Sequence, residues 1–327
     1  MIYLNDVKNE LRKKLLNREV LDRFIEIDIN ICDLLNYYRS IHGFTASHIV
    51  TASEILYEML TSDNTFRIIS FTGNIVATGL RGLITQMIMN RFFDAIITTC
   101  GAIDHDIAKS TGCRYYCGNW FFDDTLLRKI EIHRLGNIFI PFENYGLAIE
   151  NFTKKLLDEL VSLKKTWTPS EILYEAGRRI NDRYSILKSA FETNTPVFVP
   201  GIFDGAFGTQ IAIHSQFSGI QIDLIRDELK LLDMFFAREK IGALIIGGGI
   251  SKHHTIWFAQ FREGLDYAIY ITTAVEYDGS LSGAHPREAI SWNKLKPESK
   301  NTIVYGDATV VLPLIFIGTM CLLREKQ

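Results

Sequence analysis

Seven short apolar segments limit the possible folds of this chain more than any other feature. They span residues 66–74, 94–101, 137–142, 195–205, 241–249, 265–274 and 301–308, and most carry glycine, threonine or aspartate near their ends. Their continuous apolar character is typical of strands that are buried on both faces of a parallel sheet. Helical patterns separate them, including residues 170–190, which follow the capping signature TPSE at 168–171. The alternation predicts a doubly wound, mostly parallel α/β sheet with ligands bound where the strands end.

The two ends of the chain carry helical and apolar patterns. Residues 1–60 contain mainly helical patterns, and no boundary supports a second domain, so we predict one domain over 1–327. The apolar stretch 309–323 is shorter than the ~20 residues that span a bilayer, and it contains Pro313. We therefore expect a buried strand that runs into a buried helix there, and no contact with a membrane.

Charge and cysteine content exclude several classes of protein. A net charge of -3 over 327 residues gives no electrostatic basis for binding nucleic acid. The charged N-terminus lacks the apolar centre of a signal peptide. Five cysteines without an export signal predict reduced thiols and a cytoplasmic protein. Cys113 and Cys117 are four residues apart, but no second pair or histidine cluster completes a metal site, so no metal is predicted.

Glycine and hydroxyl residues follow two of the predicted strands, without the dinucleotide fingerprint G-x-G-x-x-G. The glycines at 247–249 permit either close approach of a ligand or a tight turn. The residues Thr-Thr-Cys-Gly at 98–101 precede a helix that carries Asp104 and Asp106. Free amides at a helix start suit a phosphate and a nearby carboxylate suits ribose, but helix capping explains these acids at least as well.

Residues 252–254 and 276–294 carry the densest chemistry. Lys-His-His at 252–254 places imidazoles at the mouth of the sheet, as a proton acceptor or as structural histidines. Pro286 is expected to open a short helix on which Glu288 and Trp292 share one face. Lys294 reaches the same pocket only if that helix ends before it. In a tryptophan-lined pocket its amine becomes nucleophilic, whereas most lysines are simply exposed.

The segments around Lys294 resemble the deoxyhypusine synthase family. They read EYDGS, then SGAHPREAISWNK, then VYGDATVVLPL. The blocks FTGNIVATGLRG, ITTCGAIDHDIAK, HRLGNIFIPFENY, PVFVPGIFDGAFG and GGGISKHH also match the family in its order. Together they span about 64–315, the expected catalytic core, and the forms SFTGN, DHDIAK and HHTIW resemble the archaeal branch.

This resemblance implies a Rossmann-like homotetramer that uses NAD, bound near a subunit interface. The implied reaction transfers the 4-aminobutyl group of spermidine to a lysine of the initiation factor 5A precursor and releases 1,3-diaminopropane. Lys294 would carry the imine and His253 would move the proton. The amine would be bound by Glu288, Trp292, Ser282, Asp278 and Asp104. The NAD would be bound by Gly73, Asn74, Ala77, Thr99, Cys100, Gly101, His105, Asp204, Gly248, Thr273, Ala274, Asp307 and Ala308.

Several positions depart from the family pattern. Leu281 and Thr209 stand where eukaryotic members carry acids, and Trp257 stands where they carry an asparagine that contacts the polyamine. Ala77 replaces a serine and His105 a glutamate. The amine donor is therefore less defined than the reaction type. Aminobutyl transfer to a free diamine, giving homospermidine, is the alternative activity, and a silent NAD-binding scaffold is a third.

Overall fold

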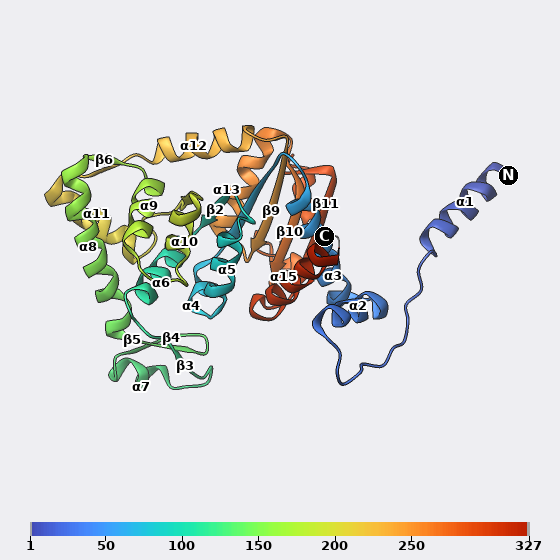
Figure 1. The fold of residues 1–327 in the computed structure, drawn as a ribbon, viewed down its shortest axis with the longest axis horizontal. Helices are drawn as coiled ribbons and strands as arrows, with labels where there is room; N and C mark the ends of the chain where they lie inside the picture. The colour runs from blue at the N-terminus through green and yellow to red at the C-terminus, as the bar shows by residue number, and fades with distance from the viewer. Residues whose placement is uncertain (1, 326–327) are drawn as a thin grey trace.

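The computed structural model describes residues 2–325 and is built around one six-stranded sheet in which every pairing is parallel (Figure 1). The strands lie in the order β11-β10-β9-β1-β2-β7. Their bounds are β1 Thr65–Phe71, β2 Ala95–Thr98, β7 Val197–Phe198, β9 Lys240–Ile246, β10 Leu265–Thr272 and β11 Leu295–Tyr305. The predicted α/β fold is confirmed.

The sheet reverses its winding between β1 and β9. From β1 the chain adds β2 and β7 on one side, then returns to add β9, β10 and β11 on the other. Ile69 of β1 pairs with Ile96 of β2 on one side and with Leu244 of β9 on the other. In open parallel sheets this reversal leaves a crevice at the carboxyl ends of the strands, where ligands bind.

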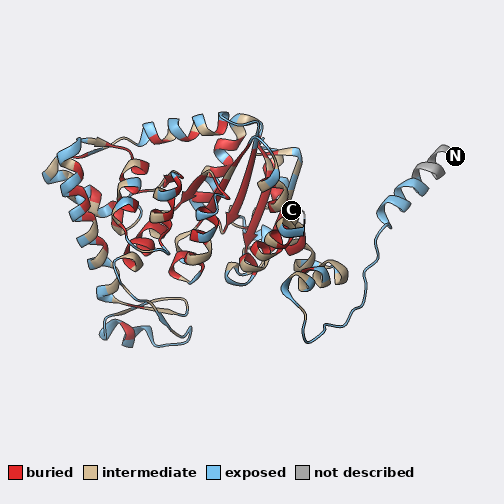
Figure 2. Cartoon of the chain, in the orientation of Figure 1, coloured by how far each residue is buried: buried red, intermediate tan, exposed pale blue. Residues whose placement is uncertain are grey.

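Helices cover both faces of the sheet, so its strands are mostly buried, apart from the first part of the edge strand β11 (Figure 2). Alternate residues of one strand enter different cores: Ile69 faces the larger core and Ile68 the smaller. The smaller core is closed by α12 Leu224–Phe236, α13 Gly249–Ala259 and α14 Pro286–Ile290. The larger core is closed by α4 Gly73–Ala77, α5 Leu80–Met89, α6 Cys100–Ser110, α8 Gly146–Leu163, α9 Pro169–Arg179, α10 Ile186–Thr193, α11 Ala206–Ser218 and α15 Ala308–Glu325, with α2 and α3.

Three helices precede the sheet, which confirms the helical N-terminal segment. They are α1 Ile2–Leu15, α2 Ile31–Ile41 and α3 Phe44–Thr61. Asn30 caps α2, because its side-chain oxygen accepts the amide N–H groups of Cys32 (2.9 Å) and Asp33 (3.1 Å). Helix α1 stands away from the body on an extended connection (Figure 1).

A small antiparallel sheet corrects one strand prediction. It has the order β3-β5-β4, with β3 Tyr116–Cys117, β4 Ile132–Leu135 and β5 Ile138–Pro141. The helix α7 Asp124–Lys129 lies in the connection between β3 and β4. The apolar segment 137–142 was expected in the parallel sheet, but it forms β5 here. Glycine at 136 (φ +60°) allows the chain to reverse between β4 and β5, so the two strands pair locally. The remaining elements are β6 Thr166–Trp167, β8 Gln221–Ile222 and the short 3₁₀ helices Phe142–Asn144, Gln260–Arg262 and Glu276–Asp278.

Two helix predictions also need correction. The capping box of Thr168 and Glu171 is present, but residues 170–190 form two helices, because Ser185 caps a new helix, α10, through the N–H of Lys188. Residues 309–323 form no strand and belong to α15, which contains Pro313. Packing against α3 holds α15 in place: the Ser53 hydroxyl donates to the Ile315 carbonyl (3.2 Å), and the Thr319 hydroxyl donates to the Ser53 carbonyl (3.3 Å). Within the described residues, α15 is the one helix long and apolar enough to span a membrane, as core helices of soluble proteins also are.

The cysteines are not all reduced, contrary to the prediction. Cys32 of α2 and Cys321 of α15 form a disulfide with Cα atoms 5.9 Å apart, whereas Cys100, Cys113 and Cys117 are free thiols. The two half-cystines are 289 residues apart in sequence, and only the packing of α2 on α15 brings them together. Sequence spacing alone gives no sign of such a long-range pair.

Candidate active site

Glycines bring the carboxyl ends of β1 and β9 into close contact with neighbouring loops. A Cβ on Gly73 would lie 2.7 Å from the carbonyl carbon of Gly101, so the loops after β1 and β2 touch through their backbones. Gly247 has φ +85°, which favours glycine, and a Cβ on Gly248 would lie 2.0 Å from the Ser282 hydroxyl oxygen. The first two glycines of 247–249 are therefore explained by a turn and by packing. Gly248 is a predicted cofactor residue and Ser282 a predicted amine-binding residue, so this contact brings the two predicted groups together.

A cavity of about 380 Å³ opens at these strand ends. Four predicted cofactor residues line it: Asn74, Thr273, Asp307 and Ala308. Asp307 is exposed, and its carboxylate accepts the N–H of Thr309 at 2.7 Å. An exposed carboxylate, an amide side chain and loop backbones at a strand-switch crevice fit the ribose and phosphate groups of a dinucleotide. Ala274 follows Thr273 in the same loop, and Ala77 is buried at the end of α4.

The small antiparallel sheet forms the other wall of this cavity, which the sequence did not indicate. Trp120 and residues 135–138 line it opposite Asn74 and Asp307. The indole of Trp120 packs over Gly136, where a Cβ would lie 2.9 Å from the ring. The run Asn-Trp-Phe-Phe at 119–122, with its exposed aromatic rings, is the signal that could have identified this wall.

Thr99, Cys100 and Gly101 form the start of α6 beside Gly73, as predicted from their position after β2. Cys100 is buried, and burial together with Asp104 raises the pKa of its thiol to about 12. The thiol therefore stays protonated and contributes packing rather than a nucleophile. Asp204 lies exposed in the loop between β7 and α11.

Asp104 and His105 are both buried within α6 and make contacts with neighbouring parts of the fold. The Asp104 carboxylate accepts the N–H groups of Ala206 (2.9 Å) and Phe207 (2.8 Å) and the hydroxyl of Tyr145 (3.2 Å). It caps α11 and is only 1% exposed, so this geometry gives no support to its assignment as an amine ligand. His105 Nδ1 lies 2.8 Å from the hydroxyl oxygen of Tyr115, and burial and Lys109 lower its pKa to about 4. It lies among aromatic rings as a neutral imidazole.

Lys294 lies near other residues predicted for the active site. Its Nζ lies 5.3 Å from the ring centroid of Trp292 and 5.7 Å from that of Trp257. The ring of His253 stacks on that of Trp257 with centroids 5.6 Å apart and 25° between the planes. Burial and the Lys294 ammonium lower the pKa of His253. The structure thus brings Lys294, His253 and Trp292 together, and adds Trp257.

The short helix α14 places Lys294. It ends before that residue, as the prediction requires, but it also ends before Trp292, so the expected helical face shared by Glu288 and Trp292 does not form. His285 Nδ1 accepts the N–H of Arg287 (3.1 Å) at the start of the helix, and the last helical residue is Ile290. Asn293 has φ +53°, which reverses the chain so that the Lys294 N–H donates to the Ala289 carbonyl at 2.9 Å. Glu288 is exposed on this helix. The helix end therefore lets Lys294 and Trp292 lie on one side.

Lys252 is a buried charged residue that the sequence did not single out. It is 1% exposed, its Nζ donates to the Ala284 carbonyl (3.0 Å), and it lies 4.2 Å from the centroid of the Tyr270 ring. Burial lowers its pKa to about 8, with Glu288 opposing the change. The loop before α14 is thereby tied to α13. Asp278, also predicted to bind the amine, lies exposed in this loop, and hydrogen bonds from Ser280 lower its pKa.

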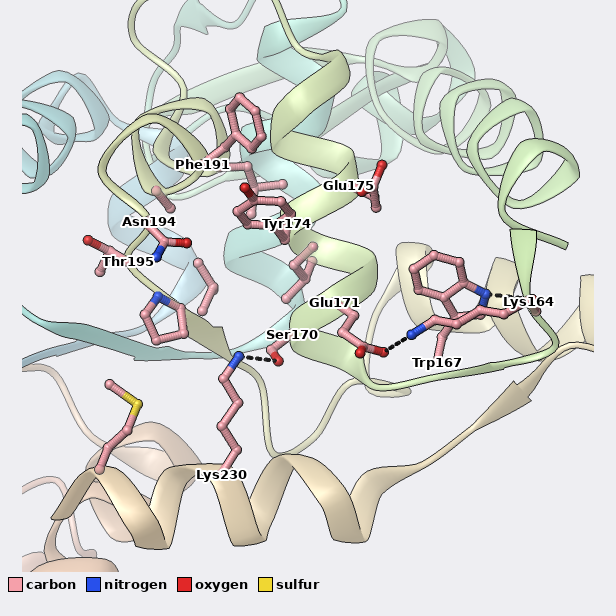
Figure 3. A pocket seen from close by; sticks show the side chains of 16 residues that line it. Lys164, Trp167, Ser170, Glu171, Tyr174, Glu175, Phe191, Asn194, Thr195 and Lys230 are labelled. Carbon is pink, nitrogen blue, oxygen red and sulfur yellow. Dashed lines mark hydrogen bonds and ion pairs between the residues drawn. The ribbon is translucent and has the colours of Figure 1, made fainter. Parts of the chain in front are cut away.

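A second cavity, of about 510 Å³, lies between α9, α10 and α12 (Figure 3). Figure 3 shows Lys230 extending from α12 toward Ser170, where its Nζ donates to the hydroxyl at 3.3 Å. Lys164 pairs with Glu171 at 2.8 Å in the same cavity. It contains none of the predicted catalytic or cofactor residues, so the strand-end crevice is the candidate active site.

Comparison with known proteins agrees with this geometry. The family model described as "Deoxyhypusine synthase" matches residues 33–319. A probable deoxyhypusine synthase of Sulfolobus acidocaldarius is 53% identical over 93% of this chain and 97% of that protein. One of Thermoplasma acidophilum is 49% identical over 93% and 98%. A crystal structure from Entamoeba histolytica, assigned to the deoxyhypusine synthases, superposes with a TM-score of 0.62 at 23% identity, covering 92% of this chain and 97% of that one. This chain belongs to the deoxyhypusine synthase family.

Proposed function

We propose that this transferase moves the 4-aminobutyl group of spermidine to a lysine of the initiation factor 5A precursor, with NAD as its cofactor. The observation that carries the proposal is the position of Lys294, whose Nζ lies within 6 Å of two indole rings and beside His253. Membership of the family supports the reaction type.

Bound NAD would take up a hydride from the carbon beside the secondary amine and return it to the transferred fragment. Asn74, Thr273 and Asp307 are the side chains that would hold it, since they line the strand-end cavity. Trp120 lines the same cavity and would contribute an aromatic face to that site. The remaining steps belong to the residues around Lys294.

His253 is suited to accept a proton. Its pKa is lowered by burial and by Lys294, so at neutral pH its imidazole is uncharged and free to act as a base. The amine of Lys294 would attack the oxidised fragment, release 1,3-diaminopropane and hold the butyl group as an imine until the acceptor lysine displaces it. Glu288, exposed on α14, would pair with an ammonium of the polyamine.

The test is intact-mass analysis of an archaeal initiation factor 5A precursor after incubation with the protein, NAD and spermidine. We expect the mass of one aminobutyl group to be added, and only when NAD is present. The variant Lys294→Ala should lose transfer by at least about a thousandfold, because the imine cannot form, while NADH still binds with wild-type affinity.

Other results would point elsewhere. Unchanged turnover in Lys294→Ala would exclude the enzyme imine. An unmodified acceptor protein, with homospermidine formed when putrescine is added, would assign the transfer to a free diamine. Absence of both products from a protein that binds NADH would favour the silent scaffold.

We also propose a homotetramer in the cytoplasm. Large apolar side chains on the outer surface of two helices support association, among them Phe217 of α11 (86% exposed) and Ile225 of α12 (73% exposed). A disulfide does not exclude the cytoplasm, because intracellular proteins of some archaea retain such bonds.

A further inference from the structure

Trp257 lies in the candidate active site, although the sequence marked it only as a departure from the family. It lies one turn beyond His253 on α13 and is 43% exposed. Its ring stacks on the imidazole of His253 and meets the edge of Phe261, with centroids 6.3 Å apart and planes at 88°. Contacts on two sides therefore hold the indole while part of it stays open to solvent.

Trp257 and Trp292 lie near the same ammonium group from different elements. Trp257 belongs to α13 and Trp292 follows α14, and the Lys294 Nζ lies 5.7 Å and 5.3 Å from their ring centroids. Both distances are within the range of cation–π attraction. The two rings therefore lie on either element beside the Lys294 amine, within reach of an alkylammonium group bound there.

Carboxylates do not surround this lysine. Within residues 8–325, whose side chains the structure describes, Lys294 makes no ion pair within 4.0 Å, and Glu288 acts electrostatically on Lys252. Leu281 and Thr209 add no charge at the positions where eukaryotic members of the family carry acids. Indole faces attract ammonium groups and also pack against methylenes, so they suit an alkyl polyamine where acids are few.

We propose that Trp257 is a specificity-determining residue that forms, with Trp292, an aromatic clamp for the alkyl chain and an ammonium of the donor amine. The clamp places the carbon that reacts next to the Lys294 amine. This inference rests on the proposed function and names how its amine substrate is recognised. It also explains how a site with few acids binds a polycation.

The experiment compares Trp257→Ala, Trp257→Leu and Trp257→Phe in steady-state transfer with spermidine. Loss of the indole should raise KM for spermidine about tenfold in the alanine and leucine variants, with a smaller change in kcat. Phenylalanine keeps an aromatic face and should stay within about threefold of wild type. Phe24→Ala, which removes an aromatic ring that is 96% exposed between α1 and α2, is the matched control and should leave KM unchanged.

A binding measurement separates the clamp from the chemistry. In the Lys294→Ala background, which forms no imine, calorimetric titration with spermidine in the presence of NADH should show about tenfold weaker binding after Trp257→Ala. NADH affinity should not change. An unchanged KM and an unchanged spermidine affinity in Trp257→Ala, beside a wild-type protein that transfers the aminobutyl group, would overturn the clamp. A fall in kcat alone would also overturn it, whereas a wild-type protein without transfer would overturn the proposed function instead.

Discussion

At the scale of single residues, the pKa of His253 gives a pH test of its role. Burial and Lys294 lower this pKa from its ordinary value of 6.5, so the base stays uncharged to a lower pH than an exposed histidine would. The value of kcat/KM should therefore remain flat as the pH falls to about 6.5 and decline only below that value, as His253 becomes protonated. His253→Ala should lose this decline along with most of the activity. A pH–rate profile of aminobutyl transfer measures both, and a decline centred above pH 6.5 in the wild type would contradict the assignment.

The residues that the sequence could and could not identify differ in a physical way. Lys294, Trp292 and His253 follow motifs with fixed spacing, so they could be named from the sequence, and the structure brings them together. Lys252 and Trp120 could not, because their positions depend on contacts between distant segments. Lys252 of α13 contacts the loop before α14, and Trp120 of the small-sheet region lines the cavity at the strand ends, and both contacts exist only in the folded chain.

At the scale of elements, buried acids of α6 organise the helices around it. Asp106 is 1% exposed; its carboxylate accepts Arg81 Nε at 2.6 Å and the N–H groups of Ile186 (3.0 Å) and Leu187 (2.9 Å) at the start of α10. Capping was one of two explanations for the acids at 104 and 106. The geometry supports capping, but the capped helices are α11 and α10 rather than α6 itself.

This arrangement predicts a large loss of stability in Asp106→Ala. The change leaves the buried guanidinium of Arg81 without one of its carboxylates and leaves two amides uncapped, so the free energy of unfolding should fall by about 3 kcal/mol. Asp158→Ala is the matched control, because this carboxylate is 60% exposed where it contacts His214, and its loss should cost less than about 1 kcal/mol. Urea denaturation followed by circular dichroism measures both variants. Equal losses in the two would show that the buried cluster does not stabilise the helix packing.

Element boundaries could be predicted where local signals are strong. The capping box at Thr168 marks the start of α9, and Pro286 marks the start of α14. The division of 170–190 into two helices escaped prediction, because the start of α10 depends on Ser185 and on the distant carboxylate of Asp106. The strand at 138–141 was placed in the wrong sheet for a similar reason, since an apolar segment alone does not specify its partner strand.

At the scale of the whole molecule, the doubly wound sheet and its crevice followed from the alternation of buried strands and helices. That pattern extends over many residues, so the predicted fold class stays correct when single elements are assigned wrongly. The packing of α2 on α15 was not predictable, because it brings together segments that lie near opposite ends of the sequence. The disulfide between Cys32 and Cys321 is the clearest result of that contact.

This disulfide should contribute strongly to stability, because it joins residues 289 positions apart. Such a bond restricts the unfolded chain, and more so as the enclosed loop lengthens, so its loss should lower the free energy of unfolding by about 3 kcal/mol. Denaturation of the wild type in the presence of a reductant, and of Cys32→Ser without one, should give the same lowered value. Cys113→Ser, which removes a free thiol, should match the oxidised wild type.

Thiol labelling of the unfolded protein shows whether the disulfide is present, and therefore whether its loss explains the change in stability. Without reductant, three of the five cysteines should react, and with reductant all five. If all five react without reductant and reduction leaves the unfolding curve unchanged, the packing of α15 on α3 holds the two ends of the chain together without the covalent bond. If three react and reduction lowers stability as expected, the covalent bond itself fixes α2 against α15.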